Sequence, residues 1–342
     1  MEPFDPPFQQ FYKNLFDNHF IDQSSPKTNQ IEAFHEVEAS EFELPLIDLS
    51  RLNHGGFDCE QCKREIAEAS QQWGFFQVVN HGISWEILEK MRHEQVKAFK
   101  KPFHDKVNGN GHRELNFPAD SYRWGTPSAT CLQQLAWSEA FHVPLTEIST
   151  VADAATGLST TMKQYATIVS NLAEKLAEIL AEKLGQTSDF FKKNCVPSMC
   201  YIRMSRYPPC PVTPQVLGLM PHTDSDFLTI LHQDQVGGLQ LQKNGKWINV
   251  HPNQETLLVI IGDLFQAWSD GVYKSLEHRV VANKQYERFS TAYFLCPSYE
   301  TVIESCGESS VYRRFSFREF RQQVQDDVKR FGHKIGLSRF IL

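Results

Sequence analysis

The clearest hydrophobic period in the chain lies between residues 159 and 184, where apolar residues recur at steps of three and four. They are Met162, Tyr165, Ala166, Val169, Leu172, Ala173, Leu176, Ile179 and Leu180. This spacing places them on one face of an α-helix, and Gly185 is a typical residue to end it. The pattern therefore predicts one long amphipathic helix whose apolar face needs a sheet to lie on.

After this helix the pattern changes to short apolar and β-branched segments with no helical period between them. The predicted strands are residues 200–207, 227–232, 238–242, 247–250, 257–261, 276–281 and 289–295. Asn244-Gly245 separates the third strand from the fourth and is a strong signal for a two-residue hairpin. Many short strands at regular spacing favour a β-sandwich or jelly-roll barrel over an alternating α/β sheet. The expected fold is mainly β with flanking helices around a double-stranded β-helix (jelly-roll) core.

The remaining segments complete this division of the chain. Residues 1–40 mix polar and aromatic residues without a period and are expected to form a loose arm. Residues 41–150 should form an α/β flanking region, which includes a helix from 85 to about 103 capped by Ser84. Residues 151–198 hold the long helix and its connection, residues 199–300 the jelly-roll core, and residues 301–342 a C-terminal helical segment.

Composition narrows the possible partners. The 342 residues carry a formal net charge of −7 and a pI near 6.0, which gives no basic surface to attract nucleic acid or an anionic membrane. The longest aliphatic run is far too short to span a membrane, and the first residues do not resemble an export signal. We therefore expect a small-molecule partner and a cytoplasmic location, with the nucleus as an alternative location. The sequence does not indicate an oligomeric state.

Cysteine usage agrees with this compartment. Eight cysteines in a chain of this length are too sparse for a disulfide scaffold and should remain reduced. Cys59 and Cys62 have zinc-ligand spacing, but no second pair completes a site. We interpret their spacing as coincidence.

A candidate metal site comes from His222 and Asp224, which stand two residues apart and so point to one face of an extended segment. The most convincing third ligand is His278, which follows Asp224 after 53 intervening residues. Two imidazoles and one carboxylate form the facial triad of non-haem Fe(II) oxygenases, which leaves metal positions open for a co-substrate and oxygen.

A second pair with the same spacing is Arg288 and Ser290. In a strand both side chains share a face, so a guanidinium and a hydroxyl can bind one carboxylate end of a dicarboxylate.

The order and spacing of these residues resemble the plant soluble 2-oxoglutarate- and Fe(II)-dependent dioxygenases. The resemblance implies that His222, Asp224 and His278 hold Fe(II) and that Arg288 and Ser290 hold the distal carboxylate of 2-oxoglutarate. It extends to Tyr207-Pro-Pro-Cys210, whose tyrosine also contacts the co-substrate in that family. Ser205 stands where the family usually has Asn, and its hydroxyl offers one donor instead of the two of an amide.

Further upstream, the sequences Pro45-Leu-Ile-Asp-Leu49 and Trp73-Gly-Phe-Phe-Gln-Val-Val-Asn-His81-Gly also resemble that family. We interpret His81 as a structural residue at a turn, because it lies outside the triad spacing. The resemblance implies oxidative decarboxylation of 2-oxoglutarate by O₂ to succinate and carbon dioxide, coupled to substrate hydroxylation.

Two longer blocks are similar to one subfamily. Residues 122–142 and 218–241, together with 262–278, look like signature blocks of the gibberellin 2-oxidases that act on twenty-carbon precursors. The implied reaction is 2β-hydroxylation of a carboxylated diterpenoid, which inactivates a growth hormone. Open alternatives are gibberellin 3- or 20-oxidation, flavonoid oxidation, a non-catalytic iron or 2-oxoglutarate sensor, and an iron oxidase that uses no 2-oxoglutarate.

One segment could contact this substrate. Arg123 lies between Tyr122 and Trp124, so the cation could pair a substrate carboxylate while the rings line an apolar pocket. Neighbouring side chains on a strand face opposite ways, however, so the three converge only in a loop or bulge. The competing interpretation is a core strand with one arginine that reaches solvent.

Overall fold

The computed structural model describes residues 3–17, 43–108, 121–150, 157–187, 189–213, 216–307 and 310–342. Its larger sheet has eight strands in the order β1-β2-β10-β7-β12-β5-β4-β3. All neighbouring strands in it are antiparallel except β1 and β2. The strands are β1 (Leu46–Asp48), β2 (Phe75–Val79), β3 (Tyr122–Trp124), β4 (Glu139–Pro144), β5 (Tyr201–Tyr207), β7 (Leu228–Gln233), β10 (Leu257–Ile261) and β12 (Arg288–Leu295).

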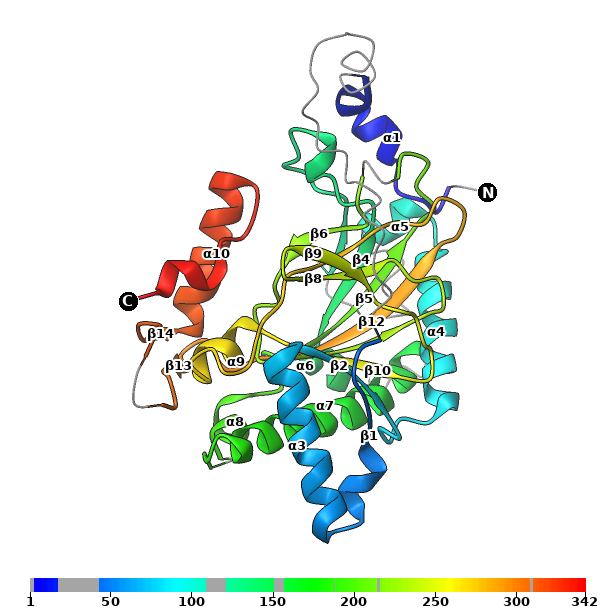
Figure 1. Ribbon diagram of the computed structural model, residues 1–342. Helices are drawn as coiled ribbons and strands as arrows, with labels where there is room; N and C mark the ends of the chain where they lie inside the picture. Colours follow the sequence, from blue (N-terminus) through cyan, green and yellow to red (C-terminus); the bar gives the residue numbers. More distant parts are fainter. Residues whose placement is uncertain are drawn as a thin grey trace.

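The middle of this sheet is the most apolar part of the chain. Every residue of β7, β10 and β12 is buried, because helices cover one face of the sheet and a second sheet covers the other. That smaller sheet has the order β6-β11-β8-β9, with β6 (Leu219–His222), β11 (His278–Val280), β8 (Leu239–Lys243) and β9 (Lys246–Asn249). The two sheets form the expected jelly-roll core (Figure 1).

The predicted hairpin is also present. Asn244 and Gly245 join β8 to β9 with φ angles of 53° and 75°, the left-handed conformations that a tight hairpin turn requires.

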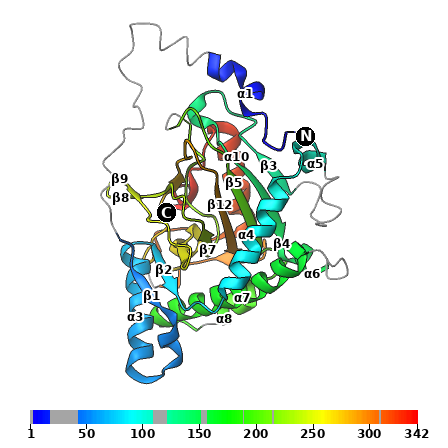
Figure 2. The same ribbon diagram turned by 90° about the vertical axis from the view of Figure 1, so that its right-hand side faces the viewer.

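Helices cover the outer face of the larger sheet (Figures 1 and 2). They are α3 (Gly56–Gln72), α4 (Trp85–Phe99), α5 (Phe103–Asn108), α6 (Leu145–Thr150), α7 (Gly157–Lys183) and α8 (Asp189–Asn194). The long predicted helix is α7, and Gly185 follows its end with a φ of 72°. The helix predicted for residues 85–103 instead ends at Phe99, and a separate helix α5 begins at Phe103. Pro102 explains the break, because proline disfavours helical backbone in the residue before it.

The two ends of the chain pack on different hydrophobic clusters. The N-terminal arm contains α1 (Phe8–Phe11), and Phe8, Tyr12 and Phe16 are buried against a small cluster around Trp137. The rest of the predicted arm, residues 1–2 and 18–40, lies outside the described residues. At the other end lies α10 (Phe317–Phe331), which Ser316 caps and Gly332 ends.

The remaining elements are short. They are α9 (Asp263–Trp268), which was not predicted, β13 (Val302–Ile303), β14 (Phe315–Ser316) and the 3₁₀ turns η1 (Leu49–Asn53), η3 (Leu132–Gln134) and η5 (Gly336–Phe340). One hydrophobic cluster extends from Leu44 to Phe340, so the predicted segments between them share a core. None of the described helices has the length and apolar character needed to cross a membrane.

Candidate metal centre and co-substrate site

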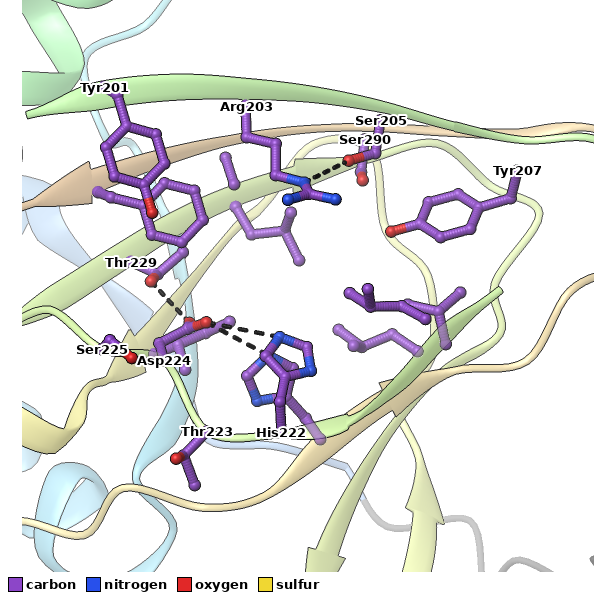
Figure 3. A pocket seen from close by; sticks show the side chains of 18 of the residues that line it. Tyr201, Arg203, Ser205, Tyr207, His222, Thr223, Asp224, Ser225, Thr229 and Ser290 are labelled. Atoms are coloured by element: carbon purple, nitrogen blue, oxygen red, sulfur yellow. Dashed lines mark hydrogen bonds and ion pairs between the residues drawn. The ribbon is translucent and has the colours of Figure 1, made fainter. Parts of the chain in front are cut away.

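The pairing of two short strands assembles the predicted triad. β6 ends at His222 and β11 begins at His278, and these two residues are direct partners in the antiparallel ladder. Their rings lie 4.3 Å apart, and Asp224 follows His222 in the loop that leaves β6. The Asp224 Oδ1 atom lies 3.7 Å from Nε2 of each histidine. One potential ligand atom from each residue falls within 4.8 Å of the others, as a single metal ion requires (Figure 3).

Hydrogen bonds orient each of these side chains. The Nδ1–H of His222 donates to the carbonyl of Met220 at 2.7 Å, and that of His278 faces the carbonyl of Leu276 at 3.3 Å. Each Nε2 therefore keeps its lone pair for a metal. Thr229 donates to Asp224 Oδ2 at 2.7 Å, which leaves Oδ1 directed at the histidines.

Burial and neighbouring groups together set the protonation of His222 and Asp224. Loss of solvent, followed by the charge of His278, lowers the pKa of His222 to about 3. Burial alone would raise the pKa of Asp224, but the two imidazoles and the Thr229 hydroxyl lower it overall. A neutral imidazole beside an ionised carboxylate is the state in which these groups bind a divalent metal.

The strand register also gathers the residues predicted for the co-substrate. Arg288 is the direct partner of Tyr207 across β12 and β5, and Ser290 is the direct partner of Ser205. The Arg288 guanidinium lies 4.9 Å from the ring centre of Tyr207, donates to Gln233 Oε1 at 2.8 Å and reaches Ser290 Oγ at 3.4 Å.

Arg288 is only 1% exposed, yet its Nε has no hydrogen-bond partner among the described residues. A buried cation with an unused donor fits a bound carboxylate, since an unsatisfied buried donor is costly.

These two groups of residues line one cavity of about 240 Å³ between the sheets. Its wall also includes apolar side chains, which are Leu219, Leu231, Leu239, Ile260, Val280, Ala292 and Phe294. Two cations that the sequence analysis missed, Arg203 and Arg321, line it as well. Arg203 could have been found from its two-residue spacing before Ser205, whereas no local pattern marks Arg321.

The structure places the predicted substrate segment elsewhere. Tyr122, Arg123 and Trp124 do not line this cavity. Tyr122 is buried and its hydroxyl donates to Glu139, Arg123 is exposed, and Trp124 contacts Phe8 of the N-terminal arm. The segment is a strand, β3, so its side chains alternate in direction and do not converge.

Two family models match the chain. The model described as 2OG-Fe(II) oxygenase superfamily matches residues 194–297, and the one described as non-haem dioxygenase in morphine synthesis N-terminal matches residues 44–155. The first match includes all three triad residues, Arg288 and Ser290.

Similar proteins cover nearly the whole chain. It is 58% identical to gibberellin 2-beta-dioxygenase 8 of Arabidopsis thaliana, over 98% of both chains. It is 48% identical to gibberellin 2-beta-dioxygenase 6 of Oryza sativa subsp. japonica, over 88% of this chain and 85% of that one.

Solved structures resemble the fold. JOX2 in complex with 2OG, Fe and JA aligns with a TM-score of 0.68 at 28% identity, over 83% of this chain and 85% of that one. The dioxygenase for auxin oxidation in rice aligns with a TM-score of 0.70 at 26% identity, over 88% of this chain and 100% of that one.

Proposed function

Because the chain belongs to the 2OG-Fe(II) oxygenase superfamily, we propose that it hydroxylates gibberellins at the 2β position and so inactivates them. The chain is an Fe(II)- and 2-oxoglutarate-dependent dioxygenase. The observation that carries the gibberellin assignment is its 58% identity to a gibberellin 2-beta-dioxygenase over 98% of both chains.

His222, Asp224 and His278 hold the iron in this proposal. A set of two histidines and one carboxylate would leave metal positions open for 2-oxoglutarate and oxygen. Arg288 and Ser290 hold the distal carboxylate of 2-oxoglutarate, and Tyr207 stands over the Arg288 guanidinium. Ser205 lies opposite Ser290 in the register and completes this end of the cavity.

When bound, iron and 2-oxoglutarate supply the oxidising power for hydroxylation, at the expense of O₂ and with release of succinate and carbon dioxide. The residues of the chain orient these groups and exclude water from them. Asp224, His278 and Arg288 are each at most 7% exposed, so the reaction is shielded from solvent on the side of the protein.

The proposal includes a preference for twenty-carbon gibberellins, which rests on the similarity of residues 122–142 and 218–241 to signature blocks of that subfamily. The test is incubation of the enzyme with Fe(II), 2-oxoglutarate and either a twenty-carbon or a nineteen-carbon gibberellin. Mass spectrometry and NMR of the products identify the oxidised carbon.

We expect a 2β-hydroxylated product, formed faster from the twenty-carbon substrate. Oxidation at carbon 3 or 20 would overturn the assigned position. Binding of gibberellin without any succinate formation would indicate a sensor.

A further inference from the structure

We infer that Arg203 and Arg321 together bind the carboxylate of the organic substrate. This inference rests on the proposed function, because it names the residues that recognise the acid group of a gibberellin. It replaces Arg123, whose side chain does not reach the cavity.

Arg203 is directed into the cavity by the two-residue period of β5. Tyr201, Arg203, Ser205 and Tyr207 all line the cavity, while the residues between them face the opposite side of the sheet. Figure 3 shows the Arg203 guanidinium pointing into the space across from His222 and Asp224. Its Nε reaches the neutral Ser205 hydroxyl at 3.3 Å, and no described carboxylate pairs with it.

Arg321 reaches the same cavity from the C-terminal helix α10. It also lines a neighbouring hollow, and Tyr201 borders both spaces. Within the described part of the chain, Arg321 has no ion pair. Other arginines of this C-terminal segment do have one: Arg313 pairs with Glu319, Arg318 with Glu300 and Arg339 with Asp327.

The charge balance of the cavity favours an anionic substrate. Among the described residues that line the cavity, Asp224 supplies the one carboxylate. The positive charge of Arg288 offsets its negative charge. When both are bound, the charges of a ferrous ion and of the 2-oxoglutarate dianion also cancel. The positive charges of Arg203 and Arg321 then remain, in a partly buried setting where an unpaired charge is unfavourable.

The co-substrate site at Arg288 and the proposed substrate site at Arg203 lie at different positions along the strands. Arg288 stands opposite Tyr207, whereas Arg203 stands opposite Ala292, four residues further along β12. The backbone positions are roughly 13 Å apart, although the Arg203 side chain extends toward the co-substrate end, where its Nε reaches the Ser205 hydroxyl at 3.3 Å. In this inference Arg288 serves 2-oxoglutarate, while Arg203 and Arg321 bind a second acid.

The wall beside these arginines suits an apolar skeleton. Tyr201 is stacked between His142 and Phe294, with ring centres at 3.9 and 4.4 Å. Phe294 and Ala292 continue this wall. A carboxylate held by two guanidiniums beside a rigid aromatic surface is the recognition chemistry of a polycyclic carboxylic acid.

The experiment compares a gibberellin with its fully methylated ester. Equilibrium binding is measured anaerobically by calorimetry with Fe(II) and 2-oxoglutarate present, for wild type, Arg203→Met, Arg321→Met and the double variant. Arg330→Met is the matched control, because Arg330 is an exposed residue of α10 outside the cavity. The affinity for 2-oxoglutarate is measured in parallel.

We expect the acid to bind roughly 10- to 150-fold more weakly to each single variant, the range for loss of a charged hydrogen bond. The wild type should strongly prefer the acid over the ester, and the double variant should bind both alike. Arg330→Met should behave as wild type. The affinity for 2-oxoglutarate should stay within about twofold in all of them, because Arg288 is intact.

Equal discrimination between acid and ester by the wild type and the double variant would overturn the inference. So would a loss of 2-oxoglutarate affinity in Arg203→Met as large as in Arg288→Met. If the wild type forms no 2β-hydroxylated product but the double variant loses the discrimination between acid and ester, the proposed function fails and the result supports this inference. If it binds no gibberellin, abietic acid and its methyl ester replace the probes, and equal binding of the two overturns the inference.

Discussion

At the scale of single residues, the proposed metal site consists of His222, Asp224 and His278. Each of His222→Ala, Asp224→Ala and His278→Ala removes one of the three protein ligands, so we expect loss of iron binding and of turnover with the fold retained. Metal analysis, succinate formation and circular dichroism measure the three properties. Near-normal activity with iron still bound in any variant would mean that the triad is misassigned.

Substitution of Arg288 tests the co-substrate end of the cavity. Arg288→Met keeps most of the side-chain volume but removes the charge, so the affinity for 2-oxoglutarate should fall roughly 10- to 150-fold. Iron binding should survive, because Arg288 contacts none of the triad residues through a hydrogen bond. Arg288→Lys should recover only part of the affinity, since an ammonium cannot present two parallel donors. An unchanged affinity for 2-oxoglutarate would assign its carboxylate to another cation.

At the scale of elements, the chain after α10 supports the loop that carries Asp224, one of the proposed metal ligands. Lys334 Nζ lies 2.6 Å from Asp263 Oδ2, and it donates to the Thr223 carbonyl at 2.9 Å and to the Ser225 hydroxyl at 2.7 Å. Thr223 and Ser225 flank Asp224, a proposed metal ligand. Lys334, which is distant in the sequence, therefore holds residues 223–225 of the proposed metal site in place.

Lys334→Met should lower the free energy of unfolding by about 3–5 kcal/mol, because it leaves Asp263 buried without its cation. It should also weaken iron binding, since the loop loses two hydrogen bonds. Lys329→Met, an exposed change on α10, is the control. Thermal unfolding and iron titration measure both effects. A lowered melting temperature with unchanged iron affinity would show that Lys334 supports the fold but not the loop.

The N-terminal arm is attached mainly by aromatic contacts. Phe8 stacks on Trp137 at 4.4 Å and meets Trp124 edge-on at 5.5 Å, while Asp5 pairs with the buried Arg206 at 2.7 Å. Phe8→Ala should release the arm without unfolding the barrel, because Phe8 belongs to a cluster separate from the main core.

Limited proteolysis should then cut within residues 3–17 faster than in wild type, with Gln9→Ala, a change at an exposed position of α1, as the comparison. An unchanged cleavage rate would mean that other contacts suffice to hold the arm.

At the scale of the whole molecule, one core joins flanking helices, barrel and C-terminal segment. The hydrophobic cluster extends from Leu44 to Phe340, so the metal-free protein should unfold in a single thermal transition. Ligands that bind only the folded state should raise the temperature of that transition. A ligand at a hundred times its Kd adds about 2.7 kcal/mol of stability.

Calorimetry with and without Fe(II) and 2-oxoglutarate measures the shift, and a chelator should reverse it. Two separated transitions in the metal-free protein would instead indicate independent domains.

The sequence alone determined those features that depend on local pattern. The period of residues 159–184 predicted α7, Asn244-Gly245 predicted the β8–β9 turn, and two-residue spacing placed Arg288 and Ser290 on one face. These predictions succeeded because helical and strand periods act between near neighbours.

Only the tertiary structure decided how distant segments meet. The pairing of His278 with His222, the contact of Lys334 with the Thr223 carbonyl and the reach of Arg321 into the cavity all join residues on separate elements. The position of Arg123 between two aromatic residues suggested a role in binding the substrate carboxylate. In the sheet, however, Arg123 is exposed to solvent and Arg203 lines the cavity instead. Side-chain direction in a sheet depends on which face the neighbouring strands and helices cover, and that is set by packing across the whole chain.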